Sequence, residues 1–170
     1  MATAVMSQEL QAVRIKKREQ PQIFIAHTLM SKKLLEKIIR IIKNEHVTPF
    51  IANQETNEKN PVERISQAIN NSEAFFSVLT KNTLKRQSIR DWIFFEIGLA
   101  KGIWKKTSKF THRYEIFVWK DIQIKLPYNN PIKVIADSKS INTRSKKSTD
   151  MMLEEMKAIA RNISIVHKII

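Results

Sequence analysis

Short apolar segments alternate with amphipathic segments along most of this chain, and this alternation restricts the possible folds more than any other feature. Four runs rich in β-branched and aromatic residues are too short for helices, and they predict buried strands at 22–27, 47–51, 74–79 and 114–119. A weaker fifth strand is predicted at 132–135. The segments between these strands carry the helical signals.

Helical periodicity separates the predicted strands. At 32–44, apolar residues recur at spacings of three and four, opposite a row of charged side chains. Asn60 can cap a second helix with Pro61 in its first position, a third helix follows the strand at 74–79, and a last one begins near Thr149. Strands and helices that alternate in this way imply βαβ crossovers. We therefore expect an α/β, doubly wound domain with a parallel sheet and helices on both faces.

Glu96 is the only acid in the apolar run 92–100, which otherwise predicts a buried helix. Burial would desolvate this carboxylate, raise its pKa and strengthen its interaction with any positive charge that develops beside it. Trp92 and Ser88 lie four and eight residues upstream and project from roughly the same helical face, so a hydroxyl, an indole and a carboxylate would line one wall. The alternative is a structural Glu at the edge of a packed helix, bonded to a backbone amide.

The predicted topology gives this wall a place in the fold. In doubly wound domains, ligands bind beyond the carboxyl ends of the strands, where the strand order reverses. The first strand ends at His27 and Thr28, the third ends at Thr80, and the helix with Glu96 follows the third strand. We expect these residues to converge at the switch point between the first and third strands.

Several segments between 22 and 121 together resemble a known family. They are the opening strand Ile23-Phe24-Ile25-Ala26-His27, the strand ending Pro49-Phe50-Ile51-Ala52, the polar loop 53–60, and the segment 88–100 with Glu96 four residues after Trp92. This set resembles the TIR domain family, specifically its prokaryotic, NAD-cleaving members. The resemblance implies a flavodoxin-like, five-stranded parallel sheet in a single TIR-like domain at 21–170, preceded by a tail or loose helix at 1–20.

The resemblance also implies a reaction that needs only one carboxylate. Breaking the bond between nicotinamide and ribose produces an oxocarbenium-like ribose, which a fixed negative charge stabilises. The nicotinamide of NAD+ is already cationic and leaves as a neutral molecule, so a second, protonated carboxyl group is unnecessary. In NAD-cleaving relatives the Glu after the Trp is the catalytic carboxylate, and that position is Glu96 here. NAD+ is thus the expected substrate, no separate cofactor is expected, and ADP-ribose and a cyclic product both remain open.

The remaining site residues are assigned as substrate contacts. Trp92 would stack on the cationic nicotinamide, and the alternative for it is packing in the core. The other candidates are compatible with structural roles in turns or at a helix start; they are Ser88, His27, Thr28 and Asn53.

Composition excludes several other functions. The chain has 170 residues, 42% of them hydrophobic, which suits one domain with a substantial core. The absence of cysteine excludes disulfides and thiolate chemistry and agrees with a reducing compartment, so we expect a cytoplasmic protein. The four histidines have no paired spacing and give no metal signal. No apolar run approaches the roughly 18 residues needed to cross a membrane, and 1–20 lacks the apolar core of a signal peptide.

The formal charge of +14 requires an explanation. Basic residues are spread over predicted helix faces and loops, and no nucleic-acid-binding motif accompanies them, so nucleic acid is not an expected partner. A solvated basic surface would draw a dinucleotide with two phosphates toward the crevice. The expected partners are NAD+, further copies of this chain through TIR contacts that involve the loop at 53–60, and other TIR-containing proteins.

Three interpretations compete at this point. The first is an NAD-cleaving TIR enzyme in signalling or defence. The second is a TIR module that recognises another TIR domain or a nucleotide signal without catalysis. The third is an enzyme resembling nucleoside deoxyribosyltransferases, which also place a Glu in an acidic-Gly-apolar-Ala segment after a strand of a doubly wound sheet. Glu96 favours catalysis, and its spacing from Trp92 favours the TIR family.

Overall fold

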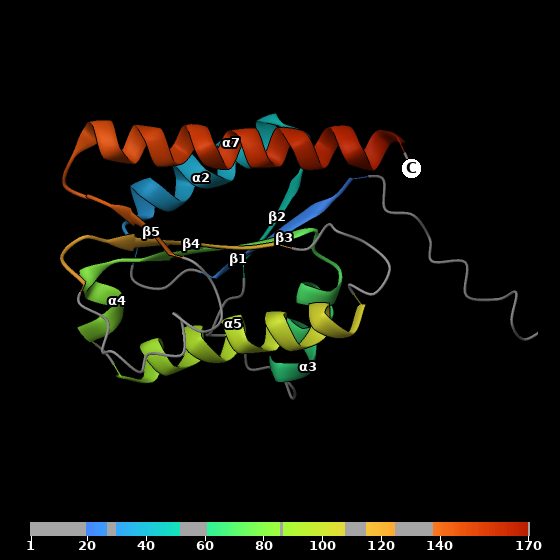
Figure 1. Ribbon diagram of the computed structural model, residues 1–170, viewed down its shortest axis with the longest axis horizontal. Coiled ribbons are helices and arrows are strands. Elements are labelled where there is room, and N and C mark those ends of the chain that lie inside the picture. The colour runs from blue at the N-terminus through green and yellow to red at the C-terminus, as the bar shows by residue number, and fades with distance from the viewer. Residues whose placement is uncertain are drawn as a thin grey trace, which may run out of the picture.

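Five parallel strands form one sheet in the order β2-β1-β3-β4-β5 (Figure 1). The computed structural model describes residues 20–26, 30–51, 61–85, 87–107, 115–124 and 138–169. The strands are β1 (Gln22–Ala26), β2 (Thr48–Ile51), β3 (Ala74–Leu79), β4 (Glu115–Asp121) and β5 (Ser138–Ile141). This strand order confirms the predicted flavodoxin-like, doubly wound fold, with its switch point between β1 and β3.

Helices cover both faces of the sheet (Figure 1). They are α2 (Lys32–Asn44), α3 (Pro61–Asn70), α4 (Lys81–Lys85), α5 (Gln87–Thr107) and α7 (Lys146–Ile169). Two of them, α2 and α7, lie on one face, and α3 and α5 lie on the other with α4 beside them. Two hydrophobic layers result, separated by the sheet.

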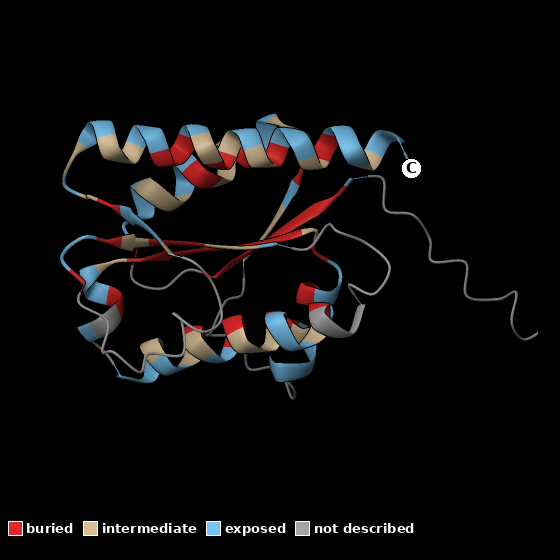
Figure 2. Cartoon of the chain, in the orientation of Figure 1, coloured by how far each residue is buried: buried red, intermediate tan, exposed pale blue. Residues whose placement is uncertain are grey.

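Alternation along β3 shows how one strand supplies both layers. Phe76 packs into the layer under α2 and α7, whereas Phe75 and Leu79 pack into the layer under α3 and α5. Every residue of β1 and β3 is buried, as expected for central strands of a parallel sheet (Figure 2). The continuous apolar runs that predicted these strands are therefore a consequence of burial on both faces.

The carboxyl end of α2 is capped without a glycine. His46 has a φ of 59°, and it is the one non-glycine residue with positive φ among the described residues. Its backbone N–H donates to the carbonyl of Lys43, and the N–H of Val47 donates to the carbonyl of Ile42. This is the Schellman arrangement, which favours glycine at the position that His46 occupies.

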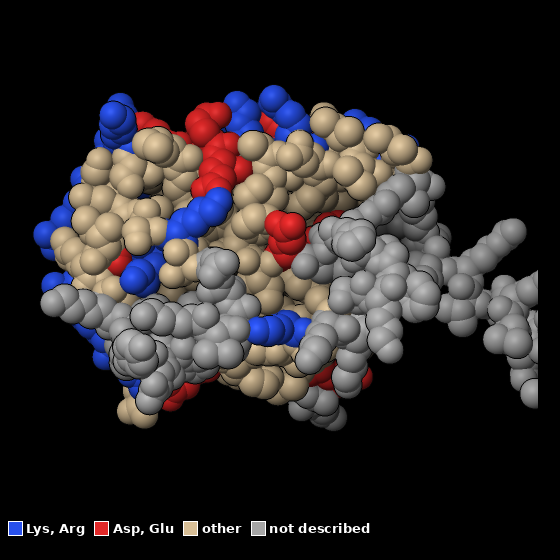
Figure 3. Space-filling view, in the orientation of Figure 1, with Lys and Arg blue, Asp and Glu red and all other residues tan. Residues whose placement is uncertain are grey.

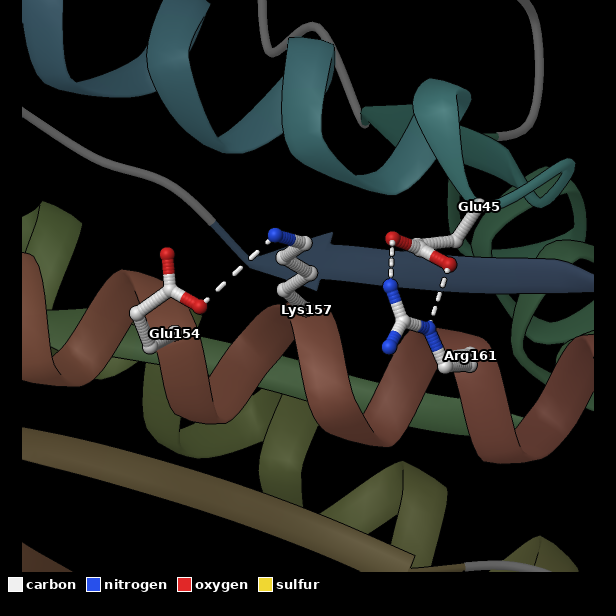
Figure 4. A network of polar contacts seen from close by, with 4 residues as sticks. All are labelled: Glu45, Glu154, Lys157 and Arg161. Carbon is white, nitrogen blue, oxygen red and sulfur yellow. Dashed lines mark hydrogen bonds and ion pairs between the residues drawn. The ribbon is translucent and has the colours of Figure 1, made fainter.

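Polar contacts from two of its residues, Glu155 and Arg161, help to fix α7 over the sheet. The Arg161 guanidinium donates to both carboxylate oxygens of Glu45, the C-cap of α2, at 3.1 and 3.3 Å (Figure 4). The buried indole of Trp119 in β4 donates to the Glu155 carboxylate at 3.0 Å, and the same carboxylate pairs with Lys139 of β5. The helix is thus tied to α2 on one side and to the sheet beneath it.

Several boundaries differ from the sequence predictions. The strand predicted at 132–135 lies outside the described residues, and the fifth strand is Ser138–Ile141, where Ile141 alone is buried. This strand lies at an edge of the sheet, where most of its side chains stay exposed and can be polar. Its sequence therefore lacks the apolar run that predicts a strand. The last helix begins at Lys146 rather than near Thr149, and the short helix α4 precedes the helix that carries Glu96. The predicted tail at 1–20 lies outside the described residues except for Gln20.

Candidate functional site

The orientation of α5 determines which side chains reach the protein interior. Ile93, Ile97, Ala100 and Trp104 are buried in the layer between α5 and the sheet, so they define the inward direction of this helix. Four residues span slightly more than one turn of an α-helix, by about 40°. Relative to Glu96, a side chain four residues earlier therefore points about 40° away around the helix axis, and one eight residues earlier points about 80° away. The side chains predicted to form one wall consequently diverge.

Burial follows this rotation. Glu96 is 2% exposed, Trp92 is half-buried, and Ser88 is exposed. The sequence prediction that the Trp and the Glu lie together is confirmed, because the Trp92 Nε1–H donates to Glu96 Oε1 at 2.9 Å. The prediction that Ser88 lines the same wall is wrong for the described structure, since eight residues rotate it onto the solvent side of α5.

Burial raises the pKa of Glu96 from 4.5 to about 8, and the hydrogen bond from Trp92 opposes this rise without cancelling it. The predicted desolvation of this carboxyl group is therefore confirmed. At neutral pH the group is mostly protonated in the absence of a ligand. A cation bound close to Glu96 would favour its ionised form and lower this pKa.

Trp92 combines the two roles considered for it from sequence. Part of its indole packs at the edge of the core under α3 and α5. Its ring centroid lies 5.4 Å from that of Phe95, at an interplanar angle of 37°, and Phe95 is exposed. The indole therefore spans the distance from the solvent side of α5 to the buried carboxylate.

The other candidate residues lie outside the described residues. His27 and Thr28 follow Ala26, the last residue of β1, and Asn53 comes two residues after the end of β2. Near the end of β3, the backbone N–H of Thr80 donates to the Thr83 hydroxyl at 3.1 Å. That contact orders the chain where it leaves the sheet to enter α4.

A second buried acid, Asp121, was not anticipated from the sequence. It lies at the carboxyl end of β4, where its Oδ1 accepts from the backbone N–H of Gln123 at 3.0 Å and its Oδ2 accepts from the Thr143 hydroxyl. Burial alone would raise the pKa of Asp121, but these hydrogen bonds and the positive charge of Arg144 lower it below its ordinary value. The ionised carboxylate joins the end of β4 to the segment after β5.

The two buried acids therefore differ in charge at neutral pH. Asp121 is ionised and both of its oxygens are engaged, whereas Glu96 is mostly protonated and receives one hydrogen bond from an indole. Glu96 is the group whose charge a ligand can change. A lone acid at the end of a strand, such as Asp121, carries no distinguishing signal in the sequence, and its partner Thr143 is 22 residues away.

Within the described ranges, no three His, Asp or Glu side chains are grouped as metal ligands, and no helix is both long and apolar enough to cross a membrane. Lys and Arg are dispersed over the face seen in Figure 3, with Asp and Glu between them.

Residues 22–129 match the model of the CAP12/Pycsar effector protein TIR domain. The chain belongs to this family of TIR domains. No curated protein matches the sequence.

Solved structures share the fold at low sequence identity. Clostridium botulinum CMP N-glycosidase, BcmB, superposes with a TM-score of 0.53 and 14% identity, covering 81% of this chain and 98% of its own. A diflavin flavoprotein A3 from Nostoc sp. superposes with a TM-score of 0.52 and 8% identity, covering 88% of this chain and 93% of its own. At these identities the likeness establishes the doubly wound fold alone.

Proposed function

We propose that this TIR domain cleaves the bond between nicotinamide and ribose in NAD+, with Glu96 as the catalytic carboxylate. The observation that supports this most is the buried Glu96 carboxyl group, which Trp92 holds from one turn away on the same helix. Membership of a TIR effector family agrees with such an activity in signalling or defence.

The chemistry fits the electrostatics of the site. As the C–N bond breaks, positive charge moves from the nicotinamide ring to the ribose, and an adjacent carboxylate stabilises that developing charge. A poorly hydrated carboxylate interacts more strongly with such a charge than an exposed one does. The cationic ring of NAD+ would itself favour the ionised form of Glu96, so substrate binding and activation of the carboxylate would be coupled.

Trp92 would have two roles in this reaction. Its Nε1–H fixes the orientation of the Glu96 carboxyl group, and its half-buried ring would offer a face to the cationic nicotinamide. Water as the acceptor would give ADP-ribose, and an internal attack by adenine would give a cyclic product. NAD+ serves as the substrate in either case, and no separate cofactor is required.

The raised pKa of Glu96 also favours a second candidate, cleavage of a nucleotide with an uncharged base. Such a base leaves more easily when it is protonated, and a carboxyl group with a pKa of about 8 can donate that proton at neutral pH. A protein that shares the fold is, by its name, a CMP N-glycosidase. The two candidates assign opposite protonation states to the active form of Glu96.

Incubation of the purified protein with NAD+, CMP and simple nucleosides, followed by mass spectrometry of the products, tests the proposal. NAD+ should yield nicotinamide together with ADP-ribose or a cyclic product. Glu96→Gln keeps the shape of the side chain and removes its charge, and it should abolish turnover. Asp91→Asn removes an exposed acid from the same helix and should not change turnover.

Two outcomes would contradict the proposal. Release of cytosine from CMP without any cleavage of NAD+ would favour the second candidate. A folded protein that cleaves none of these substrates, including at high concentration, would favour the non-catalytic TIR module instead.

A further inference from the structure

Ser77 in β3 has a buried hydroxyl group with no partner among the described residues. Its Oγ is the one fully buried side-chain nitrogen or oxygen of that part of the chain that makes no hydrogen bond. Ser77 is 0% exposed and belongs to the central strand of the sheet. A buried hydroxyl without a partner costs free energy that alanine at the same position would not. A partner that the hydroxyl gains in another state of the protein would account for its presence.

Ser77 faces the layer that also contains the Glu96 carboxyl group. Phe75 and Leu79, two residues to either side of Ser77, pack in the layer under α3 and α5. Side chains two residues apart in a strand point to the same face of the sheet, so Ser77 points into this layer as well. Glu96 reaches the layer from the opposite side, because it is buried on α5 next to Ile97, which packs in the same layer.

The two side chains also lie at a similar height between the edges of the sheet. Helix α5 runs back alongside β3, from the carboxyl edge of the sheet toward its amino edge (Figure 1). Near the amino edge, the Trp104 indole donates to the carbonyl of Ile69, at the end of α3 and shortly before β3 begins at Ala74. Glu96 lies eight residues before Trp104, about 12 Å toward the carboxyl edge along α5. Ser77 lies three residues after Ala74, about 10 Å in the same direction along β3.

The surface of the sheet beside Ser77 is formed by small side chains. In register, Ser77 pairs with Ala26 of β1 and Val118 of β4. The pair Phe24 and Phe75, two residues earlier along β1 and β3, instead fills the layer with stacked rings. The aromatic surface thus gives way to smaller side chains toward the switch point between β1 and β3. A carboxyl group from α5 can approach the sheet more closely here than over the rings.

We propose that Ser77 positions Glu96 for catalysis, by donating a hydrogen bond from its hydroxyl to Oε2 of the ionised carboxylate. A hydroxyl group rotates freely enough to donate in this way. Trp92 already donates to Oε1, so the two donors hold the two oxygens from different elements of the fold and fix the plane of the carboxylate. This role rests on the proposed cleavage of NAD+, in which the ionised form of Glu96 is the active one. Ser77 acts through Glu96 rather than on the substrate.

The charged groups around this layer do not set the pKa of Glu96. Burial raises this pKa and the hydrogen bond from Trp92 lowers it. Strands β1 and β3 contain no charged residue, and the charged side chains of α3, α5 and β4 with described surroundings are exposed or half-buried: Glu63, Arg64, Arg90, Asp91, Lys101, Glu115 and Lys120. A change in the pKa of Glu96 when Ser77 is substituted therefore reports on the hydroxyl.

An NMR titration of the Glu96 carboxyl carbon tests the contact without any substrate, and Glu96→Gln identifies the signal by its loss. In Ser77→Ala the pKa of Glu96 should rise by about one pH unit, a roughly tenfold change in proton affinity, because the ionised form loses a donor. Ser77→Thr keeps a hydroxyl and should keep the wild-type pKa. Ser72→Ala removes another buried hydroxyl, which donates to the Ala68 carbonyl, and should leave the pKa of Glu96 unchanged.

Catalysis provides a second measurement. If ionised Glu96 is the active form, the rise of kcat/KM for NAD+ with pH should move upward by the same amount in Ser77→Ala. At neutral pH kcat/KM should therefore fall about tenfold and recover at higher pH. A purely structural role of Ser77 would lower the activity at every pH instead.

An unchanged pKa of Glu96 in a folded Ser77→Ala protein would overturn the proposal. So would an equal rise of this pKa in Ser77→Thr or in Ser72→Ala. If NAD+ is cleaved while the pKa stays unchanged, the role of Ser77 fails and the proposed function stands. If the wild-type protein cleaves no NAD+, the proposed function fails, and the titration still shows whether Ser77 bonds to Glu96.

Discussion

The indole Nε1 of Trp92 lies 2.9 Å from Oε1 of Glu96, one helical turn away on α5. This hydrogen bond is made to a carboxyl group that burial otherwise makes difficult to ionise. The indole favours the ionised form and burial favours the neutral form. The protonation state of the site therefore depends on both residues, and each can be varied separately.

The first prediction concerns the indole. Trp92→Phe keeps an aromatic face and removes the hydrogen bond, so it should retain partial activity while the apparent pKa of Glu96 increases. Trp92→Ala should lose about 1–3 kcal/mol more in binding or barrier height, since it also removes the stacking surface. The measurement is kcat/KM across pH. Trp104→Phe removes a different indole from the same helix and should leave that profile unchanged, although Trp104 donates to the Ile69 carbonyl and its loss should lower the melting temperature.

The second prediction is the direction of the pH dependence of catalysis. If ionised Glu96 stabilises the oxocarbenium ion, kcat/KM for NAD+ should rise with pH and level off above about 8, the pKa of Glu96 in the free protein. A profile that falls over the same range would instead identify protonated Glu96 as the active form and would support cleavage of a nucleotide with an uncharged base.

The third prediction follows from the same pKa and concerns stability. The folded protein holds Glu96 protonated up to about pH 8, whereas the unfolded chain releases this proton near pH 4.5. The stability contributed by the protonated form is fully present below pH 4.5 and is lost as the pH rises toward 8. Over this range Glu96→Gln should gain on the order of 4 kcal/mol relative to the wild type. Urea unfolding at several pH values measures the difference, and a constant difference would show that Glu96 is hydrated in solution.

The fourth prediction concerns Asp121. Its pKa is lowered in the folded protein, so its contribution to stability is present above the ordinary value of 3.8 and is lost as the pH falls through the folded value. Asp121→Asn and Thr143→Val each disturb a partly buried hydrogen bond to an ionised carboxylate and should cost about 1–3 kcal/mol at neutral pH. Combining them should cost less than the sum, because both changes affect the same contact. Strictly additive costs would show that the two residues act independently.

The fifth prediction concerns the end of α2. His46→Gly should stabilise the protein by about 0.5–1 kcal/mol, since glycine adopts the positive φ at this position without steric cost. Asn44→Gly, within the last turn of the same helix, should destabilise it by a similar amount. Thermal melts of both variants provide the comparison, and a destabilised His46→Gly variant would show that the His46 side chain contributes a contact of its own.

The fold was predictable where burial dictates composition. Strands β1 and β3 are buried on both faces, so their sequences must be apolar, and a short apolar run between amphipathic helices has few alternatives. Strand β5 was not predicted at 138–141, because an edge strand with three polar residues is formed by pairing with β4 rather than by its own composition. Such pairing cannot be read from a local pattern.

The candidate site was predictable in part for a similar reason. The pair Trp92 and Glu96 follows from a spacing of one helical turn, and an isolated acid in an apolar helix predicts its own desolvation. Ser88 was misplaced because the mismatch between four residues and one turn accumulates over two turns. Asp121 was missed because its partner Thr143 comes from a distant segment of the chain, which only the folded sheet brings close.

The ion pair between Glu45 and Arg161 joins residues that are 116 positions apart. The layer that contains α2 also takes buried residues from α7, so this layer stays incomplete until α7 has been synthesised. The layer under α3 and α5 needs no residue beyond Ile124 among those described. During translation the two faces of the sheet thus become complete in order, with the Glu96 face first and the face under α2 and α7 last.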